Sequence, residues 1–251
     1  MTDMSPLALS GIIFALLLAG IFVGALLRKA LPQTHLGDDT QDVVRLGAGL
    51  IATIGGLLLG LLIASAKGSY DRESSQVKQI TADIILLDNL LKNYGPEALP
   101  IRNQMRSAIG PFVDRIWHEQ NTEPFSTVPQ AEQVYLNIQA LSPNNDLQRS
   151  LQARAAQVST SLAQTRVLLF VESANILPKP FLAILVFWLF VIFVTFSLFS
   201  PLNTTGLVFL SLFAFSAACA LFLILELNSP FAGLMQISSD QLRNALAPLG
   251  P

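Results

Sequence analysis

Residue pairs that could perform acid–base chemistry are scarce in this sequence. The clearest candidates are Asp83 and Asp88, which lie five residues apart in a stretch with helical periodicity. Two neighbouring carboxylates can act as a general acid and a general base. At this spacing on a helix, however, the pair is typical of a solvated face. We therefore expect both carboxylates to lie in water.

The motifs of the common enzyme classes are missing from the sequence. There is no phosphate-binding Gly-rich loop after a strand, no His/Cys/Asp/Glu cluster at metal-ligand spacing and no Ser in a G-x-S-x-G elbow. The one cysteine, Cys219, cannot form an intrachain disulfide. His35 could bind a ligand or sense pH, but a surface histidine is the simpler interpretation. The sequence thus predicts a protein that is not an enzyme, with no catalytic residue, metal site or cofactor.

Small residues at regular spacing predict that helices pack closely together in lipid. Gly56, Gly60 and Ala64 lie four residues apart in an apolar stretch, so they share one helix face. An earlier apolar run carries two glycines at the same spacing. Such faces let helix backbones approach closely. The residues expected at helix–helix contacts are Gly20, Gly24, Gly49 and Gly56.

The elements that must position these residues are four long uncharged runs. Residues 46–66 would form a helix of about 31 Å, roughly the thickness of the bilayer hydrocarbon core. Residues 6–27 form a second run, which we interpret as a retained helix because only Asp3 precedes it, whereas a signal peptide has a positive start. Residues 180–225 contain no charge, and a polar break near residues 200–206 divides them into runs at 181–200 and 206–225.

Residues 67–179 have a different character and predict a helical domain exposed to water. They hold 11 of the 15 basic and 11 of the 17 acidic residues. Two apolar stripes with heptad spacing indicate two long antiparallel helices, with shorter helices at 101–117, broken at Gly110-Pro111, and at 130–141. The stripes fit the core of a small bundle, but could also bind a partner protein or form an oligomer seam. They are Val77, Ile80, Ile84, Leu87, Leu91 and Tyr94, and Leu151, Ala155, Val158, Leu162, Thr165 and Leu169.

The predicted fold is therefore all-α: an integral membrane protein with four transmembrane helices and a helical extramembrane domain inserted between spans 2 and 3. A short helical tail follows the last span. Hydrophobic residues make up 52% of the chain and charged residues only 13%. The net charge of −2 is near zero, so we expect no nucleic-acid partner. Charged residues near the membrane edges are Asp42, Arg45, Lys67, Asp71 and Glu226. Glu226 could coordinate an ion or line a vestibule, but a hydrated carboxylate at the interface is the simpler interpretation.

Four spans place both termini on one side of the membrane, together with residues 67–179. Six basic residues lie near the span ends on that side and three on the other, which favours a cytoplasmic location for the termini and the domain. Arg28 and Lys29 argue against it, because they follow the first span directly.

Three segments of the chain are similar to a known family. They are DVVRLGAGLIAT from Asp42, LLIASAKGSYD ending at Asp71, and ELNSPFAGL from Glu226. These segments resemble a family of bacterial four-span membrane proteins that is described as bestrophin-like. The likeness extends over nearly the whole chain and implies a location in the bacterial inner membrane.

The resemblance implies a channel. Bestrophins proper are pentameric anion channels in which the second span lines a narrow hydrophobic neck. By that likeness, this chain would form a homo-oligomer, a pentamer, that conducts inorganic anions such as chloride through a pore lined by residues 46–66. On that helix Thr53, Leu57, Gly60 and Ala64 share a face, and they are the pore-lining candidates. A face that includes Gly60 and Ala64 cannot both line a pore and pack against a helix, and the sequence leaves this choice open.

Two departures from bestrophins limit what the resemblance implies. No acidic cluster matches the bestrophin calcium clasp, and the second span has no aromatic row. Calcium gating is therefore not expected, and Arg45 is the basic residue best placed to favour anions at a pore mouth. The alternative function is a non-conducting membrane scaffold whose helical domain binds a partner. This hypothesis rests on the heptad stripes and on the lack of charge within the spans.

Overall fold

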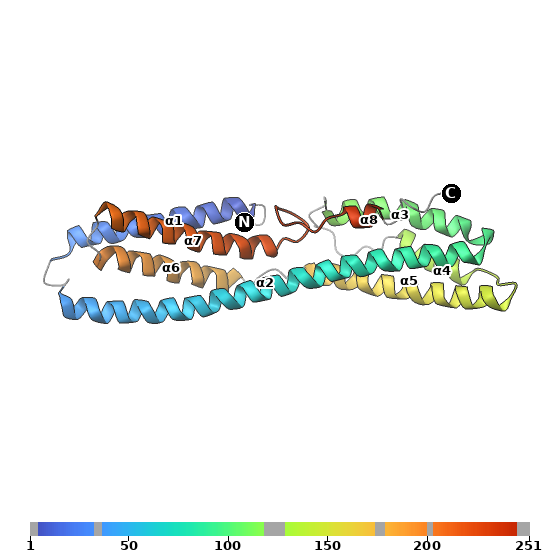
Figure 1. Cartoon of the computed structure of the whole chain (residues 1–251), viewed down its shortest axis with the longest axis horizontal. Helices are drawn as coiled ribbons and strands as arrows, with labels where there is room; N and C mark the ends of the chain where they lie inside the picture. The colour runs from blue at the N-terminus through green and yellow to red at the C-terminus, as the bar shows by residue number, and fades with distance from the viewer. Residues whose placement is uncertain (1–4, 33–36, 118–128, 174–178, 200–202, 245–251) are drawn as a thin grey trace. The chain divides into compact units, whose positions relative to one another are not determined.

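The computed structural model describes residues 5–32, 37–117, 129–173, 179–199 and 203–244, and the regular structure in these ranges is helical (Figure 1). Four of these helices are long and apolar enough to cross a membrane. They are α1 (Pro6–Ala30), α2 (Asp38–Tyr94), α6 (Lys179–Phe199) and α7 (Thr204–Leu227). The predicted all-α class with four spanning helices is confirmed. His35 and His118 lie outside the described residues.

The chain divides into two compact units. The first unit comprises Met1–Tyr70 and Ile176–Ser229, and the second comprises Asp71–Asn175 and Pro230–Pro251. The sequence had suggested 67–179 as the inserted domain, with the tail grouped with the last two spans. In the structure, the tail instead belongs to the second unit.

The first unit is a bundle of spanning helices around one apolar core. Buried side chains from α1, α2, α6 and α7 form this core, and α1 lies along both α6 and α7. Polar residues define the helix ends: the Ser5 hydroxyl accepts a hydrogen bond from Ala8 N at 3.2 Å, and the Asn203 side chain accepts one from Gly206 N at 3.0 Å. Such caps satisfy backbone N–H groups that have no partner in the first turn.

The second predicted span and the first amphipathic helix are a single helix. α2 continues without a break from Asp38 to Tyr94 and contributes residues to both units. It ends at Gly95, whose φ of 130° is accessible to glycine and strained for other residues. Pro96 follows directly as the first residue of the next short turn.

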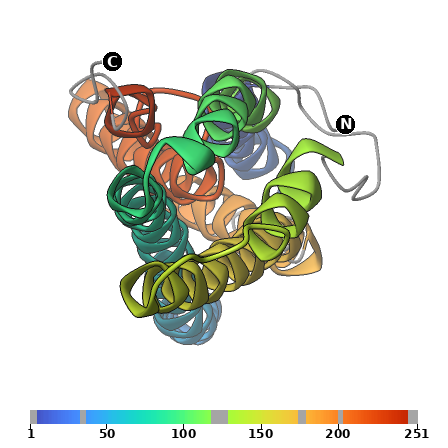
Figure 2. The same ribbon diagram turned by 90° about the vertical axis from the view of Figure 1, so that its right-hand side faces the viewer.

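The second unit packs α3 (Leu99–Trp117), α4 (Pro129–Gln139) and α5 (Asp146–Ser173) with the end of α2. The nearly end-on view in Figure 2 shows α3 in green and α5 in olive on either side of α2 in teal. A single 3-10 turn, η2 (Pro96–Ala98), connects α2 to α3. Every member of the first heptad stripe is buried, and Ala155 and Val158 from the second stripe join the same core. The first stripe thus lies in the core of this unit, whereas Leu151, Leu162 and Thr165 of the second stripe are only half-buried.

The predicted break at Gly110-Pro111 is wrong. α3 continues through Pro111, although proline cannot donate a backbone hydrogen bond inside a helix. Ile109, Phe112 and Val113 are buried on both sides of the proline. Packing along the whole face therefore stabilises a helix that local propensity alone would interrupt.

The tail after α7 packs on α3. The Trp117 indole donates a hydrogen bond to Ile237 O at 2.7 Å, and the Trp117 ring lies edge-on to Phe231 at 5.2 Å. Arg243 in the short helix α8 (Asp240–Asn244) pairs with Asp114 at 3.0 Å. These contacts assign the tail to the second unit.

Candidate functional site

The part of α2 in the first unit has one face that contacts the chain's own helices. Ala48, Gly55, Leu62 and Ala66 are buried along this face. A Cβ on Gly55 would lie 3.8 Å from Trp188 and 3.9 Å from Leu185, both in α6. Leu62 and Ala66 belong to the core shared with α1, α6 and α7. This part of α2 therefore packs at ordinary van der Waals distance, and it does so on a face other than the one that carries Gly56, Gly60 and Ala64.

The four pore-lining candidates lie together on the opposite, uncovered face of α2. Thr53, Leu57, Gly60 and Ala64 are all exposed, and the Leu57 side chain retains 72% of its accessible surface. Among the described residues, no atom lies within 4 Å of a Cβ built on Gly60. The Thr53 hydroxyl donates to Gly49 O at 2.9 Å, so it is satisfied within its own helix. The chain itself therefore leaves this face available to water, lipid or another subunit.

Two rows of different size flank the centre of this uncovered face. One row is bulky and includes Leu50 and Leu61, and the other carries Gly49 and Gly56. A Cβ on either glycine would meet open space among the described residues. Gly49 and Gly56 thus make no close helix contact with the described part of the chain, which leaves this row open to a second subunit.

Gly20 and Gly24 lie where α1 meets α6. A Cβ on Gly24 would collide with the carbonyl oxygen of Val194 and lie 2.8 Å from Ser197 Cβ. One on Gly20 would lie 3.0 Å from the Phe190 ring. The Ser197 hydroxyl is buried at this contact and donates to Ile21 O at 2.6 Å. The α1 and α6 backbones can approach this closely because Gly20 and Gly24 have no side chains.

The charged membrane-edge candidates have different surroundings. Asp42 and Arg45 are exposed near the start of α2, where the Arg45 guanidinium lies beside the Gln41 amide. Lys67 is exposed, with its Nζ 5.3 Å from the centre of the Tyr70 ring.

Asp71 and Glu226 complete this set of candidates. Asp71, the first α2 residue of the second unit, is exposed. Glu226, in the last turn of α7, keeps only 2% of its accessible surface. The interpretation of Glu226 as a hydrated carboxylate is therefore wrong, because the bundle encloses the end of α7.

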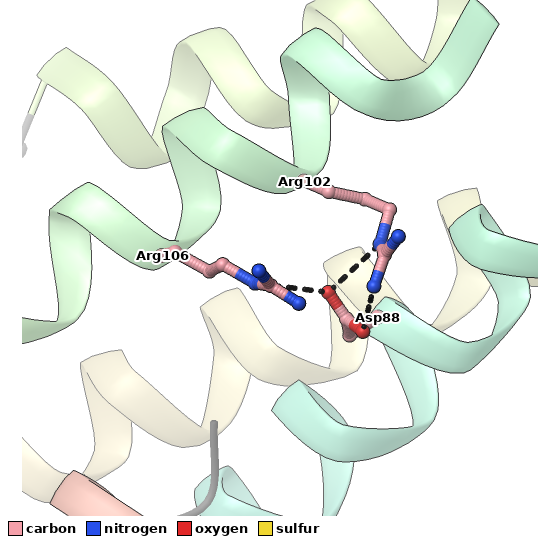
Figure 3. Close-up of polar contacts among 3 residues, drawn as sticks. All are labelled: Asp88, Arg102 and Arg106. Carbon is pink, nitrogen blue, oxygen red and sulfur yellow. Dashed lines mark hydrogen bonds and ion pairs between the residues drawn. The ribbon is translucent and has the colours of Figure 1, made fainter. Parts of the chain in front are cut away.

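A polar cluster that the sequence did not predict lies around Asp88 (Figure 3). This carboxylate has no accessible surface and receives two hydrogen bonds from Arg102, Nε to Oδ1 at 3.1 Å and Nη2 to Oδ2 at 2.8 Å. Arg106 Nε lies 3.7 Å from Oδ1. The hydrogen bond to Asp88 raises the pKa of Arg102, although burial acts in the opposite direction. These contacts of Asp88 with Arg102 and Arg106 connect α2 to α3.

The predicted solvated face at Asp83 and Asp88 is therefore wrong. Five residues on a helix correspond to about 140° around its axis, so the two carboxylates point in different directions. Asp88 faces Arg102 on α3, whereas Asp83 accepts hydrogen bonds from Ser161 on α5 at 3.2 Å and from Gln79 at 2.9 Å. They flank the buried stripe on either side. The sequence contains one indication that Asp88 is buried: it directly follows Leu87, which belongs to the first heptad stripe.

A second group of cationic side chains lies between α3 and α5. The Arg166 guanidinium lies over the Phe112 ring, with Cζ 5.5 Å from the ring centre, a favourable cation–π contact. Burial lowers the pKa of Arg166, and the nearby charge of Arg115 lowers it further. In the described part of the chain, no three His, Cys, Asp or Glu residues are grouped to hold a metal ion.

Comparison with known proteins gives one match. The family model described as the Bestrophin-like domain matches residues 11–242. No curated protein and no solved structure matches the chain. The matched range extends from α1 to α8, so it includes all four spanning helices and the described helices of the second unit. Because the match extends over most of the sequence, this membrane protein belongs to the bestrophin-like family.

Proposed function

We propose that the chain forms a homo-oligomeric ring in the membrane, a pentamer by analogy with bestrophins, with an ion-conducting pore lined by α2. The observation that carries this proposal is the uncovered face of α2, where Thr53, Leu57, Gly60 and Ala64 lie together on a spanning helix. In a ring, the same face of each subunit can point to a common axis.

The ring follows from the packing at the centre of the described bundle. Its core is filled by buried side chains from all four spanning helices, such as Leu17, Ala66, Leu185 and Leu221. Polar backbone or water-filled space at membrane depth must be enclosed by protein. The uncovered face has no ionisable residue between positions 46 and 66. A narrow apolar pore of this kind can gate by dewetting, and its small side chains leave room for an ion.

The proposed ion is an inorganic anion, which the bestrophin-like family membership and the exposed Arg45 favour. One observation favours a cation pore as the second candidate. Asp42 precedes Thr53 by eleven residues, which is close to three turns of helix, so Asp42 lies on the same face as Thr53. Arg45 is rotated from Thr53 by about 80° around the helix axis. Rings of acidic side chains select cations and rings of basic ones select anions.

Cysteine accessibility tests the pore. Cys219 is the one cysteine and is exposed, so a Cys219→Ala protein is a clean background. Single cysteines at Thr53, Leu57, Gly60 or Ala64 should let a water-soluble thiol reagent block ion flux in proteoliposomes. The matched control is Leu212→Cys, which is exposed on α7. Flux that is blocked equally at the control, or at none of the four positions, contradicts a pore along this face.

Reversal potentials under a salt gradient then decide the sign of the ion. For an anion pore, Arg45→Gln should lower the preference for chloride and Asp42→Asn should raise it. A cation preference that Asp42→Asn removes would establish the second candidate. Absence of any flux would favour the scaffold hypothesis, although the first of the heptad stripes that suggested it is buried and the second is partly buried.

We also propose that the chain lies in the bacterial inner membrane, with both termini and residues 67–179 in the cytoplasm. Support comes from the excess of basic residues on that side of the spans. A C-terminal green fluorescent protein fusion should fluoresce, and a C-terminal alkaline phosphatase fusion should be inactive. The reverse pattern would invert the topology. We further propose no enzymatic activity, since neither the sequence motifs nor the carboxylate pair described above offers a catalytic site.

A further inference from the structure

We propose that a groove between α1 and α7 in the first unit binds an anionic phospholipid, with one acyl chain along the groove and the phosphate at Lys29. This inference is independent of whether the protein conducts ions.

The groove is open to the surface and mainly apolar, with a volume of about 460 Å³. Leu18, Phe22 and Ala25 form its α1 wall, and Thr204, Leu207 and Ser211 form its α7 wall. Its volume is in the range of small-ligand sites, about 300–1000 Å³. Phe22 and Leu207 are both exposed beside it. Since both walls belong to helices that can span a membrane, the surrounding solvent is lipid, and an acyl chain is the apolar group available to fill the groove.

The α1 wall changes from apolar to cationic at one end. Residues 18, 22 and 25 follow one helix face at spacings of four and three, and the next position on that face is 29. Lys29 is exposed in the last turn of α1, which contains no acidic residue. A lysine at the end of a spanning helix extends to the headgroup region, where it attracts anionic lipid.

The α7 wall becomes polar at the same end. Figure 1 shows α1 ending where α7 begins within this unit, and the groove joins late residues of α1 to early residues of α7. Thr204 is exposed at the first turn of α7, beside the capping residue Asn203. The positive end of the helix dipole adds to the charge of Lys29. Apolar walls that lead to a cationic, hydrogen-bonding end match the chemistry of a phospholipid better than that of a neutral lipid or a neighbouring helix.

The test uses the full chain, delipidated in mild detergent and then titrated with phosphatidylglycerol or phosphatidylcholine of identical acyl chains. Native mass spectrometry counts the retained lipid. Phosphatidylglycerol should bind more tightly, and Lys29→Gln should weaken it about fivefold while leaving phosphatidylcholine unchanged. Lys92→Gln, an exposed lysine of the second unit, should change neither. Equal binding of both lipids, or no effect of Lys29→Gln, would overturn the phosphate site.

A second pair of variants tests the groove itself. Ser211→Trp should fill the groove and release both lipids, and Thr204→Trp should do the same from its exposed mouth. Leu212→Trp, on the neighbouring exposed position, should release neither. Lipid that stays bound in both groove variants would overturn the proposal. If these variants instead dissociate the oligomer with lipid retained, the groove is a subunit interface, and the proposal is again wrong.

Discussion

At the scale of single residues, the buried carboxylate of Asp88 shows how the second unit tolerates charge in its core. A buried ion is costly unless a partner of opposite charge and good hydrogen-bond geometry offsets its loss of hydration. Arg102 meets both conditions with two short hydrogen bonds. The pair is therefore costly to break from one side only.

We expect Asp88→Asn to destabilise the protein by about 3–5 kcal/mol, because it leaves the Arg102 charge buried without a carboxylate. The matched control is Asp146→Asn, which removes an exposed pair with Arg149 at a similar distance of 2.8 Å and should have no measurable effect. Thermal unfolding in one detergent measures both. Equal shifts would show that the Asp88 pair contributes no more than a surface pair.

Tyr94 gives a prediction about pH. Burial and then the charge of Glu97 raise the pKa of its phenol, so the folded state favours the neutral form. The stabilisation is present below pH of about 10, where the unfolded phenol ionises, and is lost as pH rises further. In Tyr94→Phe this loss should disappear. The melting temperatures of the two proteins should therefore diverge above pH of about 10, and parallel curves would contradict this account.

At the scale of elements, the contact between α1 and α6 depends on glycine. The hydrophobic effect does not drive helices together within lipid, so close backbone approach and hydrogen bonds such as Ser197 to Ile21 O must do so. Gly24 is the position where this approach is closest.

We expect Gly24→Ala to destabilise the first unit by roughly 1–3 kcal/mol, because the new methyl group overpacks the contact with α6. Gly11→Ala, in the same helix with no atom within 4 Å of its Cβ among the described residues, should be neutral. Thermal unfolding at matched detergent concentration compares them. A neutral Gly24→Ala would mean that α6 can move away at no cost.

At the scale of the whole molecule, the uncovered face of α2 points to assembly. A spanning helix can expose leucines to lipid, but the adjoining row of Gly49 and Gly56 offers lipid little to contact. Small residues on such a row suit the close approach of another subunit.

We expect native mass spectrometry in several mild detergents to show a closed ring, with five subunits as the expected number. Gly56→Leu should reduce the ring to smaller species without lowering the stability of the single chain, because its Cβ meets open space there. Gly11→Leu is the control and should assemble normally. A monomer or dimer in every detergent would remove the central pore.

Sequence alone determined the elements that depend on local features of the chain. Runs of uncharged residues specify four spans because their length must match the bilayer, and heptad spacing identified the buried stripe of α2 and the partly buried stripe of α5. Gly95 marks the end of α2 for an equally local reason.

Only the tertiary structure decided what lies opposite each face. Gly20 and Gly24 have the same spacing as Gly56 and Gly60, yet α6 covers the first pair and leaves the second uncovered. The burial of Asp88 likewise depends on Arg102, a residue on another helix. Periodicity records which residues share a face. The neighbour of that face depends on how helices distant in sequence pack, and this packing also decides whether a carboxylate is hydrated or buried.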